Sequence, residues 1–203
     1  NSLSFPSDVL FSQSNNTLYV TDLGNSRILA YNLADGIAPN EGAISVLGQA
    51  DFEHGSANRG AAANRGANTL ASPNSLALDT VNNTLYVTDY ANYRVLAYNL
   101  ADGISPNEAA VSVLGQTDFA SALQEQPASP SVFAEATHVA YGDGKLFVTD
   151  RGYNRVLVFD VANITNGEEA IRVLGQPNFT SKAFNQNLAN TSAAALAQPG
   201  RSL

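Results

Sequence analysis

One fourteen-residue phrase occurs three times in this chain. Its copies read LYVTDLGNSRILAY, LYVTDYANYRVLAY and LFVTDRGYNRVLVF, and they begin at Leu18, Leu85 and Leu146. A second phrase follows each copy and reads VLGQADF, VLGQTDF and VLGQPNF. The copies lie about 60–70 residues apart, which indicates one supersecondary unit used three times. Such units need neighbours, because no single unit can bury its apolar faces alone.

Each repeat is predicted to form four short strands. The segment TLYVTD is rich in β-forming residues and ends on a turn residue. The segment YRVLAYNL is apolar at nearly every position, as expected of a strand that is buried on both faces. A proline precedes the entry strand SLALD, and VSVLGQ supplies the fourth strand. We therefore expect an all-β fold of three four-stranded antiparallel units.

Four-stranded units that repeat radially are the blades of a β-propeller. Repeat 1 spans about residues 3–52, repeat 2 about 70–119 and repeat 3 about 132–179. Residues 180–203 are interpreted as a linker and the start of a fourth repeat, because LAQPGRSL resembles the entry LASPNSLAL. The long connections between repeats are expected on the surface.

A tight turn is predicted where VTDxxNxR joins two strands. Its aspartate can accept hydrogen bonds from backbone N–H groups of the same turn, and Asn25 and Asn92 tolerate left-handed backbone. An arginine follows five residues later, within reach of the carboxylate across a hairpin. A catalytic site is usually unique, so we interpret the triplicated pairs as structural. They are Asp22 with Arg27, Asp89 with Arg94, and Asp150 with Arg155.

The segment NTLYVTDYANYRVLAYNL resembles the NHL repeat. Together with VLGQxxF it is similar to the long NHL repeats of bacterial surface and secreted proteins, and the resemblance covers essentially the whole chain. It implies an NHL-type β-propeller, with the three blades forming half of a six-bladed ring. Proteins of this family serve as protein-binding platforms, RNA-binding domains, sensor ectodomains and lyases, so the resemblance leaves function open.

The amino-acid composition argues against several classes of binding partner. The 203 residues carry a net charge of −8, which opposes binding to nucleic acids and to anionic membranes. Charged residues make up 14% of the chain and cysteine is absent. Disulfide and thiolate chemistry are therefore excluded. No apolar run reaches the length of a membrane span, so membrane insertion is not expected. The neutral polar composition favours an extracellular or cell-surface location, with the periplasm as an alternative.

Alignment of the entry strands places Asp8, Ser75 and His138 at one equivalent position. The entry strand should be innermost, so these side chains are candidates for ligand binding at the mouth of a central channel. A carboxylate, a hydroxyl and an imidazole around one axis could hold a cation or water. Lyases among similar propellers use several histidines on a metal, and one histidine falls short of that pattern. We predict no catalytic residue, no metal ligand and no cofactor, with a channel cation as the alternative. His54 lies in a loop of small residues that is expected to be flexible.

We expect one of two functions. The first is a non-enzymatic scaffold that binds a protein or glycan ligand. The alternative is a metal-assisted lyase or hydrolase at the channel mouth. Three blades leave two apolar faces open, so we expect either a homodimer that closes a six-bladed ring or further repeats of a longer chain. Residues 196–203 would compete with residues 3–11 of the second copy.

Overall fold

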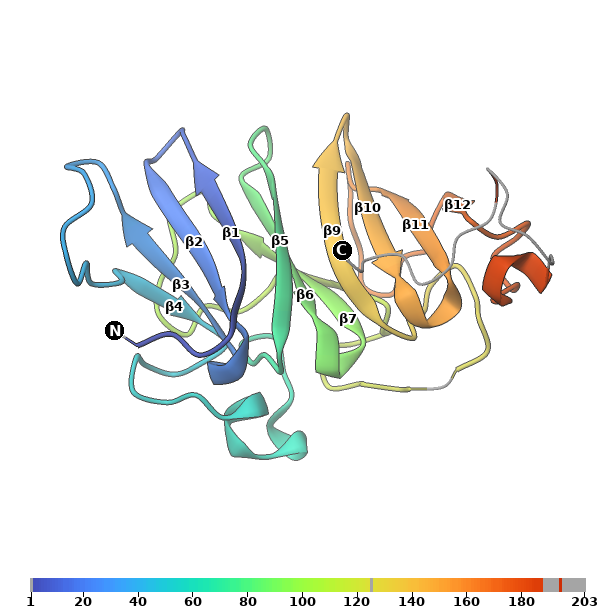
Figure 1. The fold of residues 1–203 in the computed structure, drawn as a ribbon, viewed down its shortest axis with the longest axis horizontal. Helices are drawn as coiled ribbons and strands as arrows, with labels where there is room; N and C mark the ends of the chain where they lie inside the picture. Colours follow the sequence, from blue (N-terminus) through green and yellow to red (C-terminus); the bar gives the residue numbers. More distant parts are fainter. Residues whose placement is uncertain (1, 125, 188–193, 195–203) are drawn as a thin grey trace.

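The structure, a computed structural model, describes residues 2–124, 126–187 and 194. Its strands form three separate four-stranded antiparallel sheets, and within each sheet the strands lie in chain order (Figure 1). Blade 1 contains β1 (Pro6–Ser12), β2 (Thr17–Asp22), β3 (Arg27–Asn32) and β4 (Ser45–Leu47). Blade 2 contains β5 (Pro73–Asp79), β6 (Thr84–Asp89), β7 (Arg94–Asn99) and β8 (Ser112–Leu114). Blade 3 contains β9 (Ala136–Gly142), β10 (Lys145–Asp150), β11 (Arg155–Asp160) and β12 (Arg172–Leu174).

These sheets confirm the predicted all-β fold of three four-stranded antiparallel blades. Helical structure in the described ranges is limited to short 3-10 segments. Three of them join the second and third strands of the blades, and the others lie in the connections. They are η1 (Leu23–Asn25), η2 (Ala57–Gly60), η3 (Ala62–Asn64), η4 (Tyr90–Asn92), η5 (Arg151–Tyr153) and η6 (Phe184–Asn187).

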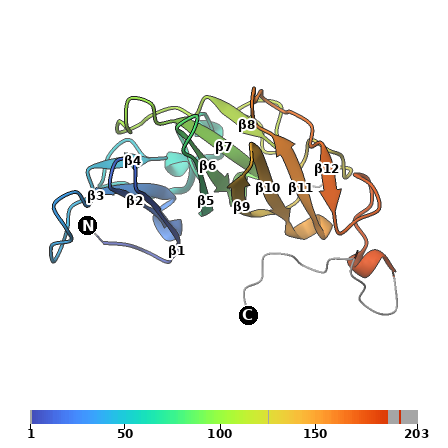
Figure 2. The same cartoon turned by 90° about the horizontal axis from the view of Figure 1, so that it is seen from above.

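The three blades form an open arc (Figure 2). The entry strands β1, β5 and β9 lie side by side on its concave side, and β4, β8 and β12 lie on the outer side. The predicted innermost position of the entry strand is therefore confirmed. The first residues of β1, β5 and β9 therefore lie around one axis.

The hydrophobic core is divided between the two blade–blade interfaces. Consecutive residues of the middle blade serve different interfaces: Leu85 packs in the core shared with blade 1, and Tyr86 packs in the core shared with blade 3. Both side chains are fully buried. Because successive side chains of a strand point to opposite faces, a blade between two neighbours must be apolar at both. This explains the nearly continuous apolar run in the repeated phrase.

The glycine of VLGQ allows the next blade to approach. Gly48, Gly115 and Gly175 have φ values of 88°, 86° and 85°, in the region that favours glycine. A Cβ atom on Gly48 would lie 2.7 Å from the side chain of Leu70, and one on Gly115 would overlap the ring of Phe133. Leu70 and Phe133 belong to the segments that enter blades 2 and 3. The repeated phrase therefore encodes close packing between blades.

The start of a fourth repeat, predicted in residues 196–203, lies outside the described residues. In the described ranges, no helix is both long enough and apolar enough to cross a membrane.

Candidate functional site

The Asp–Arg pairs occupy the same place in every blade, where the second strand ends and the third begins. In blade 2 the Asp89 Oδ2 atom lies 2.7 Å from Arg94 Nε, and both side chains are fully buried. Asp89 Oδ1 accepts a hydrogen bond of 2.7 Å from the Ala71 backbone N–H. Arg94 also donates to the carbonyls of Thr69, Gly66 and Phe119. The pair thus joins its turn to the chain that enters the blade and to the chain that leaves it.

Blades 1 and 3 repeat this arrangement. The distance from Arg Nε to the aspartate is 2.7 Å for Asp22 with Arg27 and 2.9 Å for Asp150 with Arg155. Burial raises the pKa of Asp89 and of Asp150, and the adjacent guanidinium acts against this shift. These carboxylates and guanidinium groups are engaged within the chain. The geometry supports the structural interpretation of the pairs.

Two details of the predicted turn were wrong. The backbone donors to the aspartates come from the entering segment, at Ser4 in blade 1 and Ala71 in blade 2, and not from the turn itself. The left-handed residue is the one directly before each arginine and not Asn25 or Asn92. The reason is that each turn is a 3-10 segment with a left-handed C-terminal cap. The side chains of Asn25 and Asn92 instead donate to their aspartates, at 2.9 and 2.8 Å.

The structure brings Asp8 and Ser75 together. Asp8 Oδ2 accepts hydrogen bonds of 2.9 Å from Ser75 Oγ and from the Leu76 backbone N–H. Its Oδ1 atom accepts another from Val9 N–H, also at 2.9 Å. Asp8 therefore links blade 1 to blade 2. Ser75 continues the series, because its Oγ atom lies 3.4 Å from the backbone nitrogen of Val139 in blade 3.

His138 ends this series. Its backbone N–H donates to Thr149 Oγ1 at 2.9 Å, and the residue is exposed. Its side chain lines a hollow of about 340 Å³ at the starting ends of β1, β5 and β9, which is the lower end of the arc in Figure 1. The other lining residues come from all three blades: Ser7, Leu23, Asn74, Tyr90, Thr137 and Arg151. We call this the mouth hollow.

Among the residues that line the mouth hollow, only His138 was predicted from the sequence, and three of those missed share one equivalent position. Leu23, Tyr90 and Arg151 each follow the aspartate of the repeated VTD, so one equivalent position carries an aliphatic, an aromatic and a cationic side chain. Arg151 Nε lies 2.5 Å from Glu135, and Arg151 Nη2 donates to the Tyr90 hydroxyl at 3.3 Å. The signal that could have found them is divergence at one position inside an otherwise repeated phrase.

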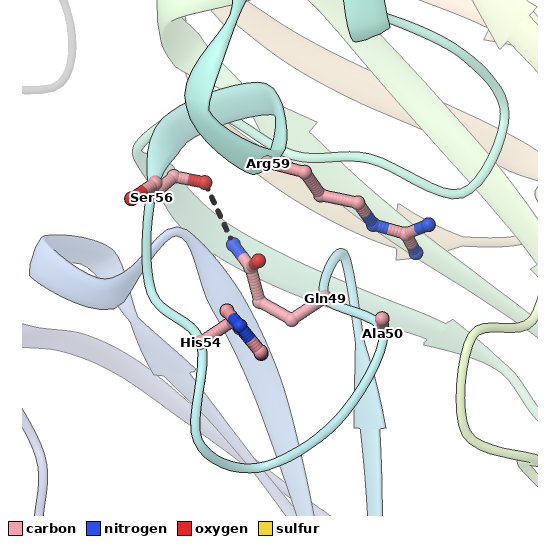
Figure 3. A pocket seen from close by; sticks show the side chains of 5 residues that line it. All are labelled: Gln49, Ala50, His54, Ser56 and Arg59. Carbon is pink, nitrogen blue, oxygen red and sulfur yellow. Dashed lines mark hydrogen bonds between the residues drawn. The ribbon is translucent and has the colours of Figure 1, made fainter.

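A second hollow, of about 250 Å³, lies beside the loop that contains His54 (Figure 3). Gln49, the last residue of the first VLGQ, donates to the Ser56 carbonyl at 2.9 Å. Gln116 and Gln176 contact their own connecting loops in the same way. This glutamine, which sequence reasoning also missed, fixes each connection to its blade.

The His54 loop, which we expected to be flexible, has defined anchors. Asn58 is buried and exchanges two side-chain hydrogen bonds with Asn92 of blade 2, at 3.1 and 2.9 Å. Arg59 donates to the Asn68 carbonyl at 2.7 Å. His54 itself pairs with Asp51, with 2.7 Å between Nδ1 and Oδ1. These contacts give the loop a structural use.

In the described part of the chain, no group of three or more His, Asp or Glu side chains is placed so that it could hold a metal ion. Asp8 already accepts three hydrogen bonds, and Ser75 donates one of them.

No protein-family model and no curated protein matches the chain. Several solved structures are similar to the chain. Kuenenia stuttgartiensis hydrazine synthase is similar with a TM-score of 0.54 and 10% identity, over 89% of this chain and 38% of that chain. The WD40 repeats of RRP9 give a TM-score of 0.52 and 12% identity, over 86% of this chain and 39% of that one. The WD40 β-propeller domain of Doa1 gives a TM-score of 0.50 and 10% identity, over 86% of this chain and 42% of that one.

The chain folds as part of a β-propeller. Its three blades span 38–42% of the lengths of these three structures. The structural similarity shows the fold, and at identities of 10–12% it shows nothing about activity. The propeller geometry makes the axis of the arc, where the mouth hollow lies, the natural place to look for a binding site.

Proposed function

We propose that this propeller is of the NHL type and acts as a non-enzymatic scaffold that binds a protein or glycan ligand at the mouth hollow. The three blades share their packing and their Asp–Arg pairs, yet they differ at the residues that line the hollow. One observation carries the proposal: Leu23, Tyr90 and Arg151, which diverge within a repeated phrase, meet there with His138.

The composition of the hollow suits recognition. Tyrosine and arginine are enriched among the residues that dominate binding energy at protein interfaces. A volume of about 340 Å³ lies in the range of ligand pockets and can take a peptide side chain or a sugar ring. Arg151 is held by Glu135 and contacts Tyr90, so both side chains are oriented before a ligand arrives.

We further propose that the scaffold operates outside the cytoplasm, as a homodimer that forms a six-bladed ring. Support for the location is compositional: charged residues make up only 14% of the chain, and neutral polar residues take their place. Support for the dimer comes from the two open faces of the arc.

The alternative function, a metal-assisted lyase or hydrolase, has weaker support. His138 is the single imidazole that lines the mouth hollow. The Asp8 carboxylate is occupied by three hydrogen bonds. Metal analysis of the purified protein together with the variant His138→Ala tests this function: a stoichiometric metal that is lost in the variant would favour it over the scaffold.

Selection from a random-peptide display library and screening on a glycan array test the scaffold. We expect binders whose affinity falls at least about tenfold in Tyr90→Ala and in Arg151→Ala, because both side chains line the hollow. The Arg151–Glu135 pair is one-third exposed, so its loss should lower the free energy of unfolding by less than about 1 kcal/mol.

A matched control is Val81→Ser, at an exposed position outside the hollow. Binders that respond equally to the control and to the hollow variants would contradict the proposal. So would the absence of any binder in both screens.

A further inference from the structure

Each end blade presents one face that the middle blade keeps buried. On the open face of blade 1, Val9 is 61% exposed, whereas the equivalent Leu76 and Val139 are 5% and 8% exposed. Leu3 is also exposed on this face, and its equivalents Leu70 and Phe133 are buried. The difference arises because Leu70 and Phe133 pack against the preceding blade, whereas none of the described residues covers this face of blade 1.

Blade 3 shows the opposite face. Leu174 is 52% exposed, whereas its equivalents Leu47 and Leu114 are 1% and 0% exposed. Phe147 is likewise exposed, although the equivalent Tyr86 is buried in the core between blades 2 and 3. Together the ends of the arc therefore carry both halves of an interface that occurs twice inside the chain.

We propose that blade 3 of one copy packs onto blade 1 of a second copy, so that two chains close a ring through two identical interfaces. The inference deepens the proposed function, because it names the partner that completes the ring around the mouth hollow. A second copy is the occupant because its blade 1 presents the same kind of face that blades 2 and 3 pack onto a preceding blade within each chain. The contact is head-to-tail, and it closes after two copies if each blade turns the chain by about one-sixth of a circle.

The inner strands indicate the first link of this closing interface. In the interior interfaces, Asp8 accepts from Leu76 N–H of the next blade, and Ser75 Oγ lies within 3.4 Å of Val139 N. The equivalent acceptor in blade 3 is His138. Equivalence places its exposed ring beside Val9 N–H and the Asp8 carboxylate of the second copy.

The outer strands indicate a second link. Val46 O of β4 accepts from Asn107 N–H of blade 2 at 3.3 Å, and Val113 O of β8 accepts from Gly167 N–H of blade 3 at 2.9 Å. A loop of each following blade thus covers the edge of the preceding outer strand, which removes an exposed sheet edge. The equivalent pair in the closing interface is Val173 O with Asn40 N–H of the second copy.

Charge complementarity supports the same pairing. Ser112 of β8 donates to the Ile164 carbonyl of blade 3 at 3.2 Å. The corresponding residue of β12 is Arg172, which is exposed, whereas Ser45 and Ser112 are buried. The equivalent of the Ile164 loop in the second copy contains Glu41. The closing interface therefore places the Arg172 cation against the loop that carries Glu41, where the interior interface has a serine against the Ile164 carbonyl.

Light scattering and sedimentation velocity on the purified chain test the proposal. We expect a species of twice the 21.3 kDa chain mass at micromolar concentration. A monomer at that concentration overturns the proposal, and so does a larger open polymer. Peptide or glycan binding at the mouth hollow is a separate readout, so failure of ring closure and failure of the proposed function can be distinguished.

Two variants establish which faces meet. Leu174→Asp and Val9→Asp each place a carboxylate in an apolar interface, so each should raise the dissociation constant at least about 100-fold. Both positions are more than half exposed in the single chain, so the blades should still fold, as circular dichroism and thermal melting will show. Val81→Asp, 80% exposed and outside both faces, is the matched control and should remain dimeric.

Mixing the two variants separates head-to-tail from symmetric contacts. The Leu174→Asp chain keeps an intact blade 1 face, and the Val9→Asp chain keeps an intact blade 3 face. An equimolar mixture should therefore regain a two-chain species held by one intact interface, although each variant alone is monomeric. If one variant alone stays dimeric, the two copies meet through identical faces, and the proposal is overturned.

Discussion

Two sets of equivalent residues in the three blades behave in opposite ways. The Asp–Arg pairs are identical in every blade and equally buried, with separations of 2.7 to 2.9 Å. The inner-strand position carries three different residues with three different exposures: Asp8 is half-buried, Ser75 is buried and His138 is exposed. The residues that are repeated stabilise each individual blade. The residues that differ between repeats lie at the axis of the arc or on its two open faces, where the blades have different surroundings.

The energetic difference follows from burial. A buried ion pair costs desolvation, which is recovered only when every donor and acceptor is satisfied. Asp89 and Arg94 meet that condition through the turn, the entering chain and the leaving chain. Every blade has the same buried turn, so the same Asp–Arg pair occurs in all three. The inner strand borders the axis, and its side chains can change without opening a blade.

The largest effect is expected for Asp89→Ala. Removing the carboxylate leaves the fully buried Arg94 guanidinium without its partner, which should cost about 3–5 kcal/mol in the free energy of unfolding. Urea denaturation followed by circular dichroism measures this change. Ligand binding should weaken only through unfolding.

The double variant Asp89→Ala/Arg94→Met sharpens the interpretation. It removes the unpaired charge and should lose less stability than Asp89→Ala alone, by at least about 1 kcal/mol. Asp51→Ala is the exposed control and should leave the stability of the parent chain essentially unchanged. If Asp89→Ala leaves stability unchanged and abolishes ligand binding, the pairs belong to a binding site and the comparison fails.

A smaller effect is expected for Gly115→Ala, in the repeated phrase VLGQ. The new Cβ must adopt a φ of +86° and would overlap Phe133 of blade 3, so we expect a loss of about 2–4 kcal/mol. Gly36→Ala is matched in backbone, with φ +100°, but has no atom within 4 Å of the new Cβ. It should lose only about 1–2 kcal/mol. Thermal melting of the two variants isolates the contact between blades, and equal losses would show that backbone strain alone is measured.

The sequence was sufficient to predict the architecture. The repeated phrases encode strands with two apolar faces, and this demand has few solutions other than blades packed on blades. Details of the turns could not be predicted, because the donors to Asp22 and Asp89 come from the entering chain. Sequence spacing within a turn carries no information about a segment that arrives from outside it.

The candidate site was predictable in part. Aligning the repeats placed Asp8, Ser75 and His138 on the inner strands, and the structure puts His138 in the mouth hollow. The alignment did not show that the side chains of Asp8 and Ser75 form a hydrogen bond with each other. Whether an equivalent residue reaches the next blade depends on side-chain length and direction, which only the packed arc defines. Tyr90 and Arg151 could not be predicted from the repeated residues, because they occupy a position that differs between the repeats.

The smallest effect concerns Asp79, at the far end of inner strand β5. Burial acts to raise the pKa of Asp79, but hydrogen bonds from the Asn82 side chain and from the Asn82 and Val81 backbone lower it below its ordinary value. Blades 1 and 3 have Ser12 and Gly142 at this position, so this carboxylate turn is specific to blade 2.

The pH dependence of this turn follows from the lowered pKa. An aspartate with a lower pKa in the folded state stabilises the protein above its unfolded pKa, and this contribution is lost as the pH falls through the folded value. Asp79→Asn should therefore cost about 1 kcal/mol at neutral pH, where the ionised carboxylate accepts its hydrogen bonds. The difference from the parent chain should shrink between about pH 5 and about pH 2, as the parent carboxylate takes up its proton. Thermal melts of both chains across that range measure the difference, and Glu53→Gln, at an exposed carboxylate in the loop after blade 1, is the control for general acid effects. If the stability difference between the two chains instead stays constant down to the lowest pH, the shape of the Asp79 turn and its number of hydrogen bonds matter, and not the charge of the carboxylate. The sequence difference between the inner strands at this position would then have no electrostatic role.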